Sequence, residues 1–402
     1  MQQLFPDIDI LSGIGQPDFH LVFQARPFAP FSEEVTSFLQ SVSARLLRMP
    51  QCRSFPDVIS FAFWCRKGSL ERLREHYAGN LRRLGRGIVY HISPSNVPVN
   101  FAYSLAASLL AGNANIVRVP SKPFEQVNLI CGALRATLEE PVFAPLRDHV
   151  VLLRYERSEE INRYFSRNCD VRVIWGGDRT IAEIRKASLP ARSFDLAFAD
   201  RYSLCVINAH EYLCKAEPAA LATHFYNDTY LTDQNACTSP HLVVWLGSAK
   251  DVVAAKHLFW DALHAVVASK YEMSAIWSVD KYTKFLEMAM GLGARLTPMS
   301  DQLILRAQLD ALAPNIDEYR GATGFFAEYD AGDLSELAAI VSRKYQTLAY
   351  YGVPVEALEA WVTTHRLCGI DRIVPIGKTM DFSLTWDGYD LIETLSRRYA
   401  IE

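Results

Sequence analysis

The stretch Gly87-Ile-Val-Tyr-His-Ile-Ser-Pro-Ser-Asn96-Val-Pro98 decides the fold class of this chain. Its apolar run at 88–92 is typical of a buried strand, and the serines and prolines that follow end that strand. Residues 99–111 are typical of a helix rich in small side chains, Gly112-Asn113 ends this helix, and 116–119 is a second apolar run. The order strand, loop, helix, strand predicts one parallel β-α-β unit.

The same alternation continues along the first half of the chain. Helices are expected at 124–138, 158–168 and 179–186, and strands at 150–153, 171–175 and 204–207. Together with the first two, these strands predict a doubly wound, five-stranded sheet in an α/β protein. Ligands of such sheets bind beyond the carboxyl ends of the strands.

A second α/β lobe is expected after about residue 208. A helix that carries His224 leads into a polar loop and the strand 242–246, and further alternation runs to about residue 376. Short strands are expected there at 294–297 and 325–329. No internal repeat or low-complexity linker separates the lobes.

Composition limits the kinds of partner. Half of the 402 residues are hydrophobic, which is typical of a globular protein with more than one core. The 41 basic and 45 acidic residues give a net charge of −4 without long runs of one sign, so neither nucleic acid nor a membrane surface is an expected partner. No membrane span is expected, and the first residues lack the pattern of a secretory signal, so a cytoplasmic location is expected.

Eight cysteines occur, and no two of them have the close spacing of a zinc site or a small disulfide framework. No bound metal is expected, and most of these thiols should be free and buried. Cys237 is the exception, because it lies in the polar loop Asp233-Gln-Asn-Ala-Cys237-Thr-Ser-Pro240 directly before a strand. Such a loop can offer access, thiolate stabilisation and nearby backbone N–H groups, so Cys237 is the candidate nucleophile.

Two further segments follow expected strands and could contribute to the same site. Asn96 is expected at the start of a helix, where its amide could donate to an oxyanion or simply cap that helix. Gly176 and Gly177 would allow a cofactor to approach the backbone closely, although a glycine pair is also common in ordinary turns. The dinucleotide fingerprint G-x-G-x-x-G is absent.

Taken together, the 87–121 segment, the Gly176-Gly177 turn and the Cys237 loop resemble the aldehyde dehydrogenase superfamily. The resemblance covers roughly residues 85–376. The segments 226–240 and 368–390 look most like the acyl-CoA reductases, the family of the fatty-acid reductase component of bacterial bioluminescence. The resemblance implies an aldehyde dehydrogenase-like fold in which a doubly wound cofactor-binding lobe joins a catalytic lobe.

One departure from the superfamily pattern favours a reductase. The oxidising members carry a general-base Glu before the cysteine, and the corresponding stretch 195–203 contains no Glu. That base activates the water that hydrolyses an acyl-enzyme, which a reductase does not need. Asp195 or Asp200 could still take its place.

The resemblance also implies site residues with weaker support. In the cofactor site it places Ser93, Pro94, Arg118 and Ser121, and Glu318 might hold the nicotinamide ribose. As a lone charge Arg118 could equally be a salt-bridge partner, and Glu318 could be a surface helix residue. We expect His224 to be a packing residue rather than a base.

The predicted function is NADPH-dependent reduction of an acyl-CoA to an aldehyde through an acyl-cysteine on Cys237, with NADH as the alternative cofactor. The expected domains are 1–208 for the cofactor, with a helical N-terminal region, 209–376 for catalysis, and a tail 377–402 that packs back or oligomerises. Alternatives are an aldehyde-oxidising dehydrogenase and a cysteine acyltransferase or thioesterase without hydride transfer. An acyl-carrier donor, an acyl-activating synthetase partner and a homo-oligomer are further expectations.

Overall fold

The structure is a computed structural model that describes residues 8–11, 18–77, 79, 82–94 and 97–402. The chain divides into two compact units, which are described separately. The first comprises Met1–Ala199 with Leu384–Glu402, and the second comprises Asp200–Ser383. The first boundary therefore precedes the one expected near residue 208, and the second follows the one expected at residue 376.

The first unit is built on a six-stranded sheet with the order β1-β5-β4-β3-β6-β7. The strands are β1 Asp9–Ile10, β3 Ile88–Ile92, β4 Ala114–Arg118, β5 Val150–Arg154, β6 Val171–Trp175 and β7 Phe194–Phe198. Among these described strands, only the edge strand β1 is antiparallel to its neighbour. Every residue of β3 and β6 is buried, as in parallel sheets covered by helices on both faces.

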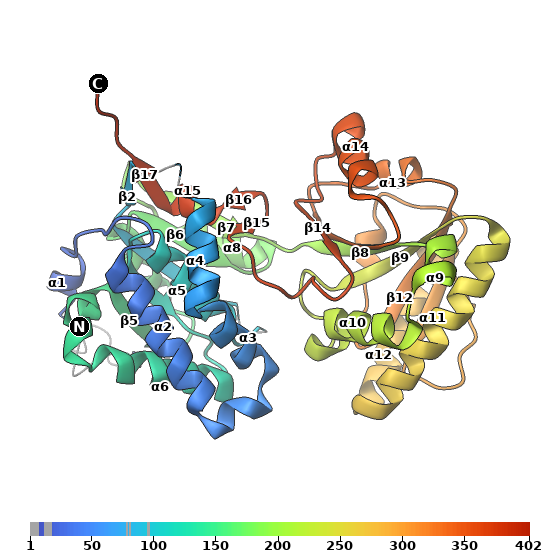
Figure 1. The fold of residues 1–402 in the computed structure, drawn as a ribbon, viewed down its shortest axis with the longest axis horizontal. Coiled ribbons are helices and arrows are strands. Elements are labelled where there is room, and N and C mark those ends of the chain that lie inside the picture. The colour runs from blue at the N-terminus through green and yellow to red at the C-terminus, as the bar shows by residue number, and fades with distance from the viewer. Residues whose placement is uncertain (1–7, 12–17, 78, 80–81, 95–96) are drawn as a thin grey trace. The chain divides into compact units, whose positions relative to one another are not determined.

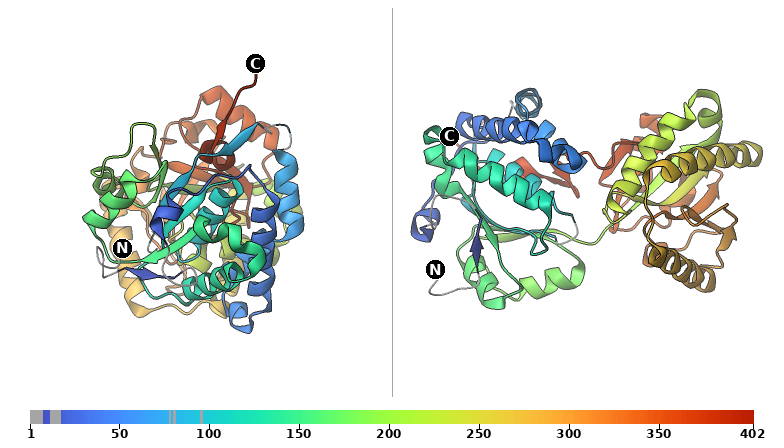
Figure 2. Two further views of the ribbon diagram at one scale, coloured as in Figure 1. Left: turned by 90° about the vertical axis from the view of Figure 1, so that its left-hand side faces the viewer. Right: turned by 90° about the horizontal axis from the view of Figure 1, so that it is seen from below.

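Helices cover the two faces of this sheet (Figures 1 and 2). They are α1 Phe19–Val22, α2 Glu33–Arg48, α3 Pro56–Trp64, α4 Lys67–His76, α5 Asn100–Leu110, α6 Glu125–Leu138, α7 Glu159–Arg167 and α8 Asp178–Arg185, with the 3-10 helices η1 Pro50–Ser54 and η2 Pro141–His149. On one face Phe165 of α7 and Ile181 of α8 join Tyr90 of β3 in a core cluster. On the other face His91 of β3 contacts Ser104 of α5, with 2.8 Å between Nδ1 and Oγ.

The second unit contains a seven-stranded sheet with the order β10-β11-β12-β9-β8-β13-β14. Its strands are β8 Tyr202–Asn208, β9 Pro240–Leu246, β10 Arg295–Thr297, β11 Leu305–Leu309, β12 Phe325–Ala331, β13 Tyr345–Tyr351 and β14 Arg372–Pro375. Only β10 pairs antiparallel among these described strands. The parallel strands thus present their amino ends, including the start of β9, along one edge of the sheet.

Two core clusters cover the faces of the second sheet. The helices are α9 Ala209–Lys215, α10 Pro218–Thr229, α11 Ala249–Lys270, α12 Ala275–Leu292, α13 Ser335–Ala338 and α14 Val355–His365, with the 3-10 helices η3 Tyr230–Thr232 and η4 Ile316–Tyr319. One cluster contains residues of α9, α10 and α11, such as Phe225 and Trp260. The other contains residues of α12, α13 and α14, such as Met288 and Trp361. Among the helices that the structure describes, none is long and apolar enough to cross a bilayer.

The C-terminal segment returns to the first unit. It contains β15 Thr385–Trp386, β16 Tyr389–Asp390, α15 Leu391–Leu395 and β17 Ser396–Arg398, and β17 pairs antiparallel with β2 Arg83–Gly85. Arg83 donates from Nε to Ser396 Oγ at 2.7 Å. The buried Asn113 donates to the Leu395 carbonyl at 2.9 Å and accepts from Arg86 N at 2.7 Å, so it joins this segment to the start of β3.

One strand assignment from the sequence is wrong. The strand expected at 204–207 in the first sheet belongs to β8 of the second sheet, and β7 occupies its place in the first. The stretch 194–198 does not show an apolar run because Asp195 interrupts it. In the fold, Arg172 of β6 pairs with Asp195 at 2.7 Å, so the tertiary structure supplies the partner that makes this strand possible.

Gly112, at the end of α5, tests the close packing of this turn against the backbone of Phe28. Its φ is +94°, and an added Cβ would lie 2.1 Å from the Phe28 carbonyl oxygen. We expect Gly112→Ala to lower the free energy of unfolding by about 2 kcal/mol or more, measured by urea denaturation.

Gly132 in α6 is the matched control. An added Cβ there meets no atom within 4 Å. Gly132→Ala should therefore leave stability unchanged or raise it by about 0.5–1 kcal/mol, because Ala loses less conformational entropy in a helix. Equal effects of the two substitutions would contradict this account of Gly112.

Candidate active site

The Cys237 loop connects η3 to β9, so it lies at the amino end of β9 in the second unit. Asp233 and Gln234 both have left-handed backbone conformations, with φ of 50° and 60°, which turn the chain sharply away from η3. Cys237 is exposed, whereas Cys65, Cys131, Cys169, Cys205 and Cys52 are buried. The loop therefore gives this thiol the access that a nucleophile requires.

Gln234 anchors the loop from inside the protein, with 1% of its surface exposed. Its Nε2 donates to the carbonyl oxygens of Pro240 at 2.9 Å and Phe325 at 3.0 Å. Its Oε1 accepts from the backbone N–H of Gly324 at 3.1 Å. One side chain thus satisfies backbone groups in both strands that adjoin the loop, β9 and β12.

Further hydrogen bonds hold the loop on both sides of the thiol. Tyr271 Oη donates to Asp233 Oδ1 at 2.6 Å, and Thr323 N donates to the Asp233 carbonyl at 3.0 Å. After the turn, Ser203 Oγ donates to the carbonyl of Cys237 itself at 2.6 Å. The backbone around Cys237 is therefore held by groups from several separate segments.

Burial distinguishes the other cysteines chemically. It raises the pKa of the Cys131 and Cys169 thiols to about 12, and it also raises the pKa values of Cys52, Cys65 and Cys205. These five thiols stay protonated at neutral pH and are poor nucleophiles. Cys214 and Cys368 are exposed like Cys237, but they lie outside the Cys237 loop.

The cofactor residues expected in the first unit follow neighbouring strands. Ser93 and Pro94 follow β3, and Gly176 and Gly177 follow β6. Within the sheet Ile92 lies opposite both Arg118 of β4 and Ile174 of β6, so these strand ends lie together. Because β4 and β6 flank β3 on opposite sides, this is the point where the strand order reverses, and ligands bind there in open α/β sheets.

Details of this edge fit a nucleotide in two respects. An added Cβ at Gly177 would meet no atom within 4 Å, so the start of α8 is open to a ligand, whereas Gly176 lies against Thr180. Arg118 donates to the carbonyl of Tyr155 at 3.3 Å and stacks over its ring, and it forms no ion pair with a carboxylate of the described residues. Asn96 lies outside the described residues, and Ser121 is half-buried after β4.

Two further predicted residues, Glu318 and His224, are exposed. Glu318 is exposed on the short helix η4. His224 is exposed on α10, beside Gly377. Among the described residues, no group of three or more His, Cys, Asp or Glu side chains is placed to hold a metal ion.

The two carboxylates that could replace the missing base are both paired with arginines. Asp195 accepts from Arg172 at 2.7 Å and from Arg185 at 3.2 Å. Asp200 accepts from Arg320 at 2.6 Å. Both carboxylates are therefore engaged in ion pairs with arginines rather than free.

Lys281 is a site residue that the sequence did not reveal. It lies on α12 with 1% of its surface exposed, and its Nζ donates to the carbonyls of Thr323 at 3.0 Å, Leu303 at 3.3 Å and Gln302. It lines a hollow of about 230 Å³ together with Asp233 and Asn235 of the Cys237 loop. A lysine in an amphipathic helix carries no sign in the sequence that it faces inward.

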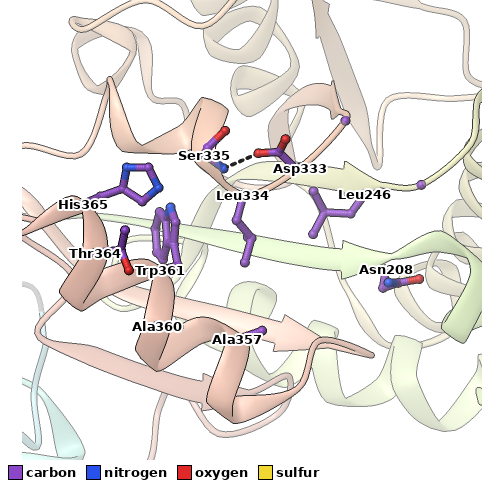
Figure 3. A pocket seen from close by; sticks show the side chains of 12 residues that line it. Asn208, Leu246, Asp333, Leu334, Ser335, Ala357, Ala360, Trp361, Thr364 and His365 are labelled. Atoms are coloured by element: carbon purple, nitrogen blue, oxygen red, sulfur yellow. Dashed lines mark hydrogen bonds between the residues drawn. The ribbon is translucent and has the colours of Figure 1, made fainter.

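A larger hollow of about 550 Å³ lies at the other edge of the second sheet, at the carboxyl ends of β8 and β9 (Figure 3). Side chains of α14, including Trp361 and His365, face the segment 332–335 across it. None of the site residues predicted from the sequence lines this hollow. This larger hollow is therefore not the site of the candidate nucleophile, Cys237.

We expect Gln234→Ala to disturb the Cys237 loop because it removes three hydrogen bonds from buried backbone groups. Each unpaired group costs about 1–3 kcal/mol, so unfolding by urea should occur at clearly lower concentration. The rate of Cys237 alkylation by iodoacetamide should change in parallel. Gln302→Ala is the control, since that side chain donates an exposed hydrogen bond to the Tyr282 hydroxyl, at 3.2 Å. A similar effect of both variants would contradict the anchoring role.

Lys281 predicts a pH dependence of stability. Burial lowers its pKa from 10.5 to about 8. At pH values between about 8 and 10.5, Lys281 is protonated in the unfolded chain but not in the folded chain. The free energy of unfolding therefore increases as pH rises, by up to about 1.4 kcal/mol per pH unit. Lys281→Met should remove this gain when unfolding is measured between about pH 7 and about pH 10. Lys284→Met on the same helix should retain it, and parallel profiles for wild type and Lys281→Met would contradict the assignment.

Comparison with solved structures defines the class of protein. The chain has the fold of aldehyde dehydrogenases: it matches aldehyde dehydrogenase 21 from Physcomitrella patens at 11% identity and TM-score 0.65, over 94% of this chain and 89% of that one. It matches 1-pyrroline-5-carboxylate dehydrogenase from Thermus thermophilus at 13% identity and TM-score 0.62, over 94% and 84%. Lactaldehyde dehydrogenase from Escherichia coli matches at 11% and 0.62, over 92% and 86%.

The family follows from the sequence comparison. The model of the family described as acyl-CoA reductase (LuxC) matches residues 27–274, which is more than half of the chain. The chain belongs to this family and is an oxidoreductase. A comparison with curated proteins gave no match. The fold and family that the sequence resemblance implied are thereby confirmed.

Proposed function

We propose that this protein reduces a fatty acyl thioester to the aldehyde, with Cys237 as the residue that carries the acyl group. The observation that carries the proposal is an exposed cysteine on a loop whose backbone is fixed on both sides, by Gln234 before it and Ser203 after it. Membership of the acyl-CoA reductase family supports the reaction class.

The first half of the reaction is acyl transfer. The Cys237 thiolate attacks the thioester carbonyl, and a tetrahedral intermediate forms with its negative charge on oxygen. Asn96 and the backbone N–H of Cys237 are the proposed donors to that oxyanion. Collapse breaks the bond to the donor sulfur, which leaves as a thiolate and takes up a proton from solvent.

The second half is reduction of the acyl-cysteine. A bound nicotinamide nucleotide supplies the hydride, and NADPH is the proposed form, with NADH as the alternative. Ser93, Pro94, Gly176 and Gly177, at the reversal point of the first sheet, are the proposed cofactor contacts, together with Arg118 and Ser121 from the β4 side. Cys237 then leaves the thiohemiacetal as a thiolate, and the aldehyde carbonyl forms as the hydroxyl proton is lost.

Paired carboxylates in the stretch 195–203 support reduction over hydrolysis. Asp195 and Asp200 are the acidic residues of that stretch, and each is held by arginine. With both carboxylates of this stretch paired, the acyl-cysteine would be protected from water until hydride arrives. An acyl-CoA or an acyl-carrier protein fits as donor, and we keep an acyl-activating synthetase partner, self-association and a cytoplasmic location as parts of the proposal.

Mass spectrometry of the denatured protein after incubation with tetradecanoyl-CoA tests the proposal. We expect one acyl adduct on wild type, its removal on addition of NADPH with release of aldehyde, and no adduct on Cys237→Ala. Cys214→Ala is the matched control, because it removes another exposed thiol and should leave the adduct intact. An adduct that survives Cys237→Ala, or one that releases acid instead of aldehyde, would overturn the proposal.

A further inference from the structure

Asp228 is a buried carboxylate that the proposed reaction does not use. It lies on α10 with 0% of its surface exposed. Its Oδ2 accepts from the backbone N–H of Gly377 at 2.6 Å, and its Oδ1 accepts from that of Thr379 at 3.0 Å. Both partners lie in the loop 376–381, which directly follows β14. This loop is about 150 residues after Asp228 in the chain.

Two opposite charges hold the same loop. A carboxylate accepts from its backbone N–H groups, and a guanidinium donates to its backbone carbonyls. Its N–H groups face Asp228, whereas its carbonyls accept from Arg372 of β14, at 2.6 Å for Thr379 and 2.9 Å for Lys378. Gly377 has φ +94°, and an added Cβ would lie 2.8 Å from His224 Cβ, so the loop lies directly against α10. The loop is therefore clamped between a buried anion and a cation.

The loop contacts the residue next to the candidate nucleophile. Thr238, the residue after Cys237, is buried, and its hydroxyl donates to the Met380 sulfur at 3.5 Å. A shift of the loop would move Met380 relative to the Cys237 loop. The loop 376–381 thus forms one wall of the Cys237 site, and the carboxylate of Asp228 anchors this wall.

Burying a carboxylate costs free energy that an apolar residue would not cost. Burial raises the pKa of Asp228 to about 6, so its ionised form lowers stability at neutral pH. The charged groups around it are Asp381 of the loop and Arg372 of β14, with the thiol of Cys205 on β8 and His224 on its own helix.

We propose that Asp228 is a positioning residue for the reductase reaction: it holds the loop 376–381 against Thr238 and so shapes the site where Cys237 receives the acyl group. This inference rests on the proposed function of Cys237. The ionised carboxylate accepts both backbone N–H bonds, whereas the protonated acid gives up acceptor capacity to its own O–H. The loop is held best when Asp228 is charged.

The variant Asp228→Asn keeps the size of the side chain and removes the charge at every pH. We expect its rate of Cys237 acylation by tetradecanoyl-CoA at neutral pH to fall by about tenfold or more, because the wall of the site shifts. Wild type should lose activity as pH falls through about 6, and Asp228→Asn should lack that limb of the profile. Backbone N–H groups of Gly377 and Thr379 should exchange faster with deuterium in the variant.

Thermal stability separates this role from a merely structural one. Because the ionised carboxylate is costly, wild type should become more stable relative to Asp228→Asn as pH falls from about 7 to about 4. At neutral pH, acylation should therefore fall without a matching fall in the unfolding temperature. Asp261→Asn on the exposed face of α11 is the control, and it should change neither quantity.

The outcomes distinguish this inference from the proposed function. Absence of any acyl adduct on wild type would overturn the proposed function. A normal adduct on wild type, with an unchanged rate and pH profile in Asp228→Asn, would overturn only the positioning role. Loss of acylation in strict proportion to lost unfolding temperature would also overturn it. Thr238→Val, which removes the hydroxyl but keeps the branched shape, should reproduce part of the rate loss.

Discussion

The candidate site depends on the hydrogen bonds of the Gln234 carboxamide. These three hydrogen bonds join the Cys237 loop to β9 and to the start of β12, and they satisfy backbone groups that have no access to water. A buried amide can do this only with all partners in place, since one missing partner leaves a costly unpaired group. In this arrangement Cys237 is exposed while its neighbours Ala236 and Thr238 are buried.

Buried charges organise the two units in a similar way. Arg172 and Asp195 join β6 to the edge strand β7 in the first unit. In the second, Glu328 accepts from the indoles of Trp245 and Trp260 and from Arg306, so every oxygen is used. Such groups are expensive to bury, and they remain acceptable because each is fully satisfied. Each of them joins elements that are neighbours in the fold.

Much of the fold could be predicted from local patterns. Apolar runs such as 88–92 and 171–175 became fully buried strands, and Gly112 ended its helix as expected, because strand burial and helix termination are written in short stretches. The pattern did not reveal β7, since Asp195 interrupts its apolar run and the compensating Arg172 lies on another strand. Lys281 and Asp228 were missed as functional candidates for the same reason: their partners are backbone atoms from distant segments.

The sequence by itself determined the class of fold and the family, and it singled out Cys237 as an accessible thiol because this residue stands in a polar loop directly before a strand. Only the tertiary structure decided what holds that loop and which carboxylates are free. Asp195 and Asp200 look alike as possible bases in the sequence, and each proves to be paired with arginine. The physical reason is that exposure and periodicity are local properties, whereas the partner of a buried charge is chosen when distant segments pack together.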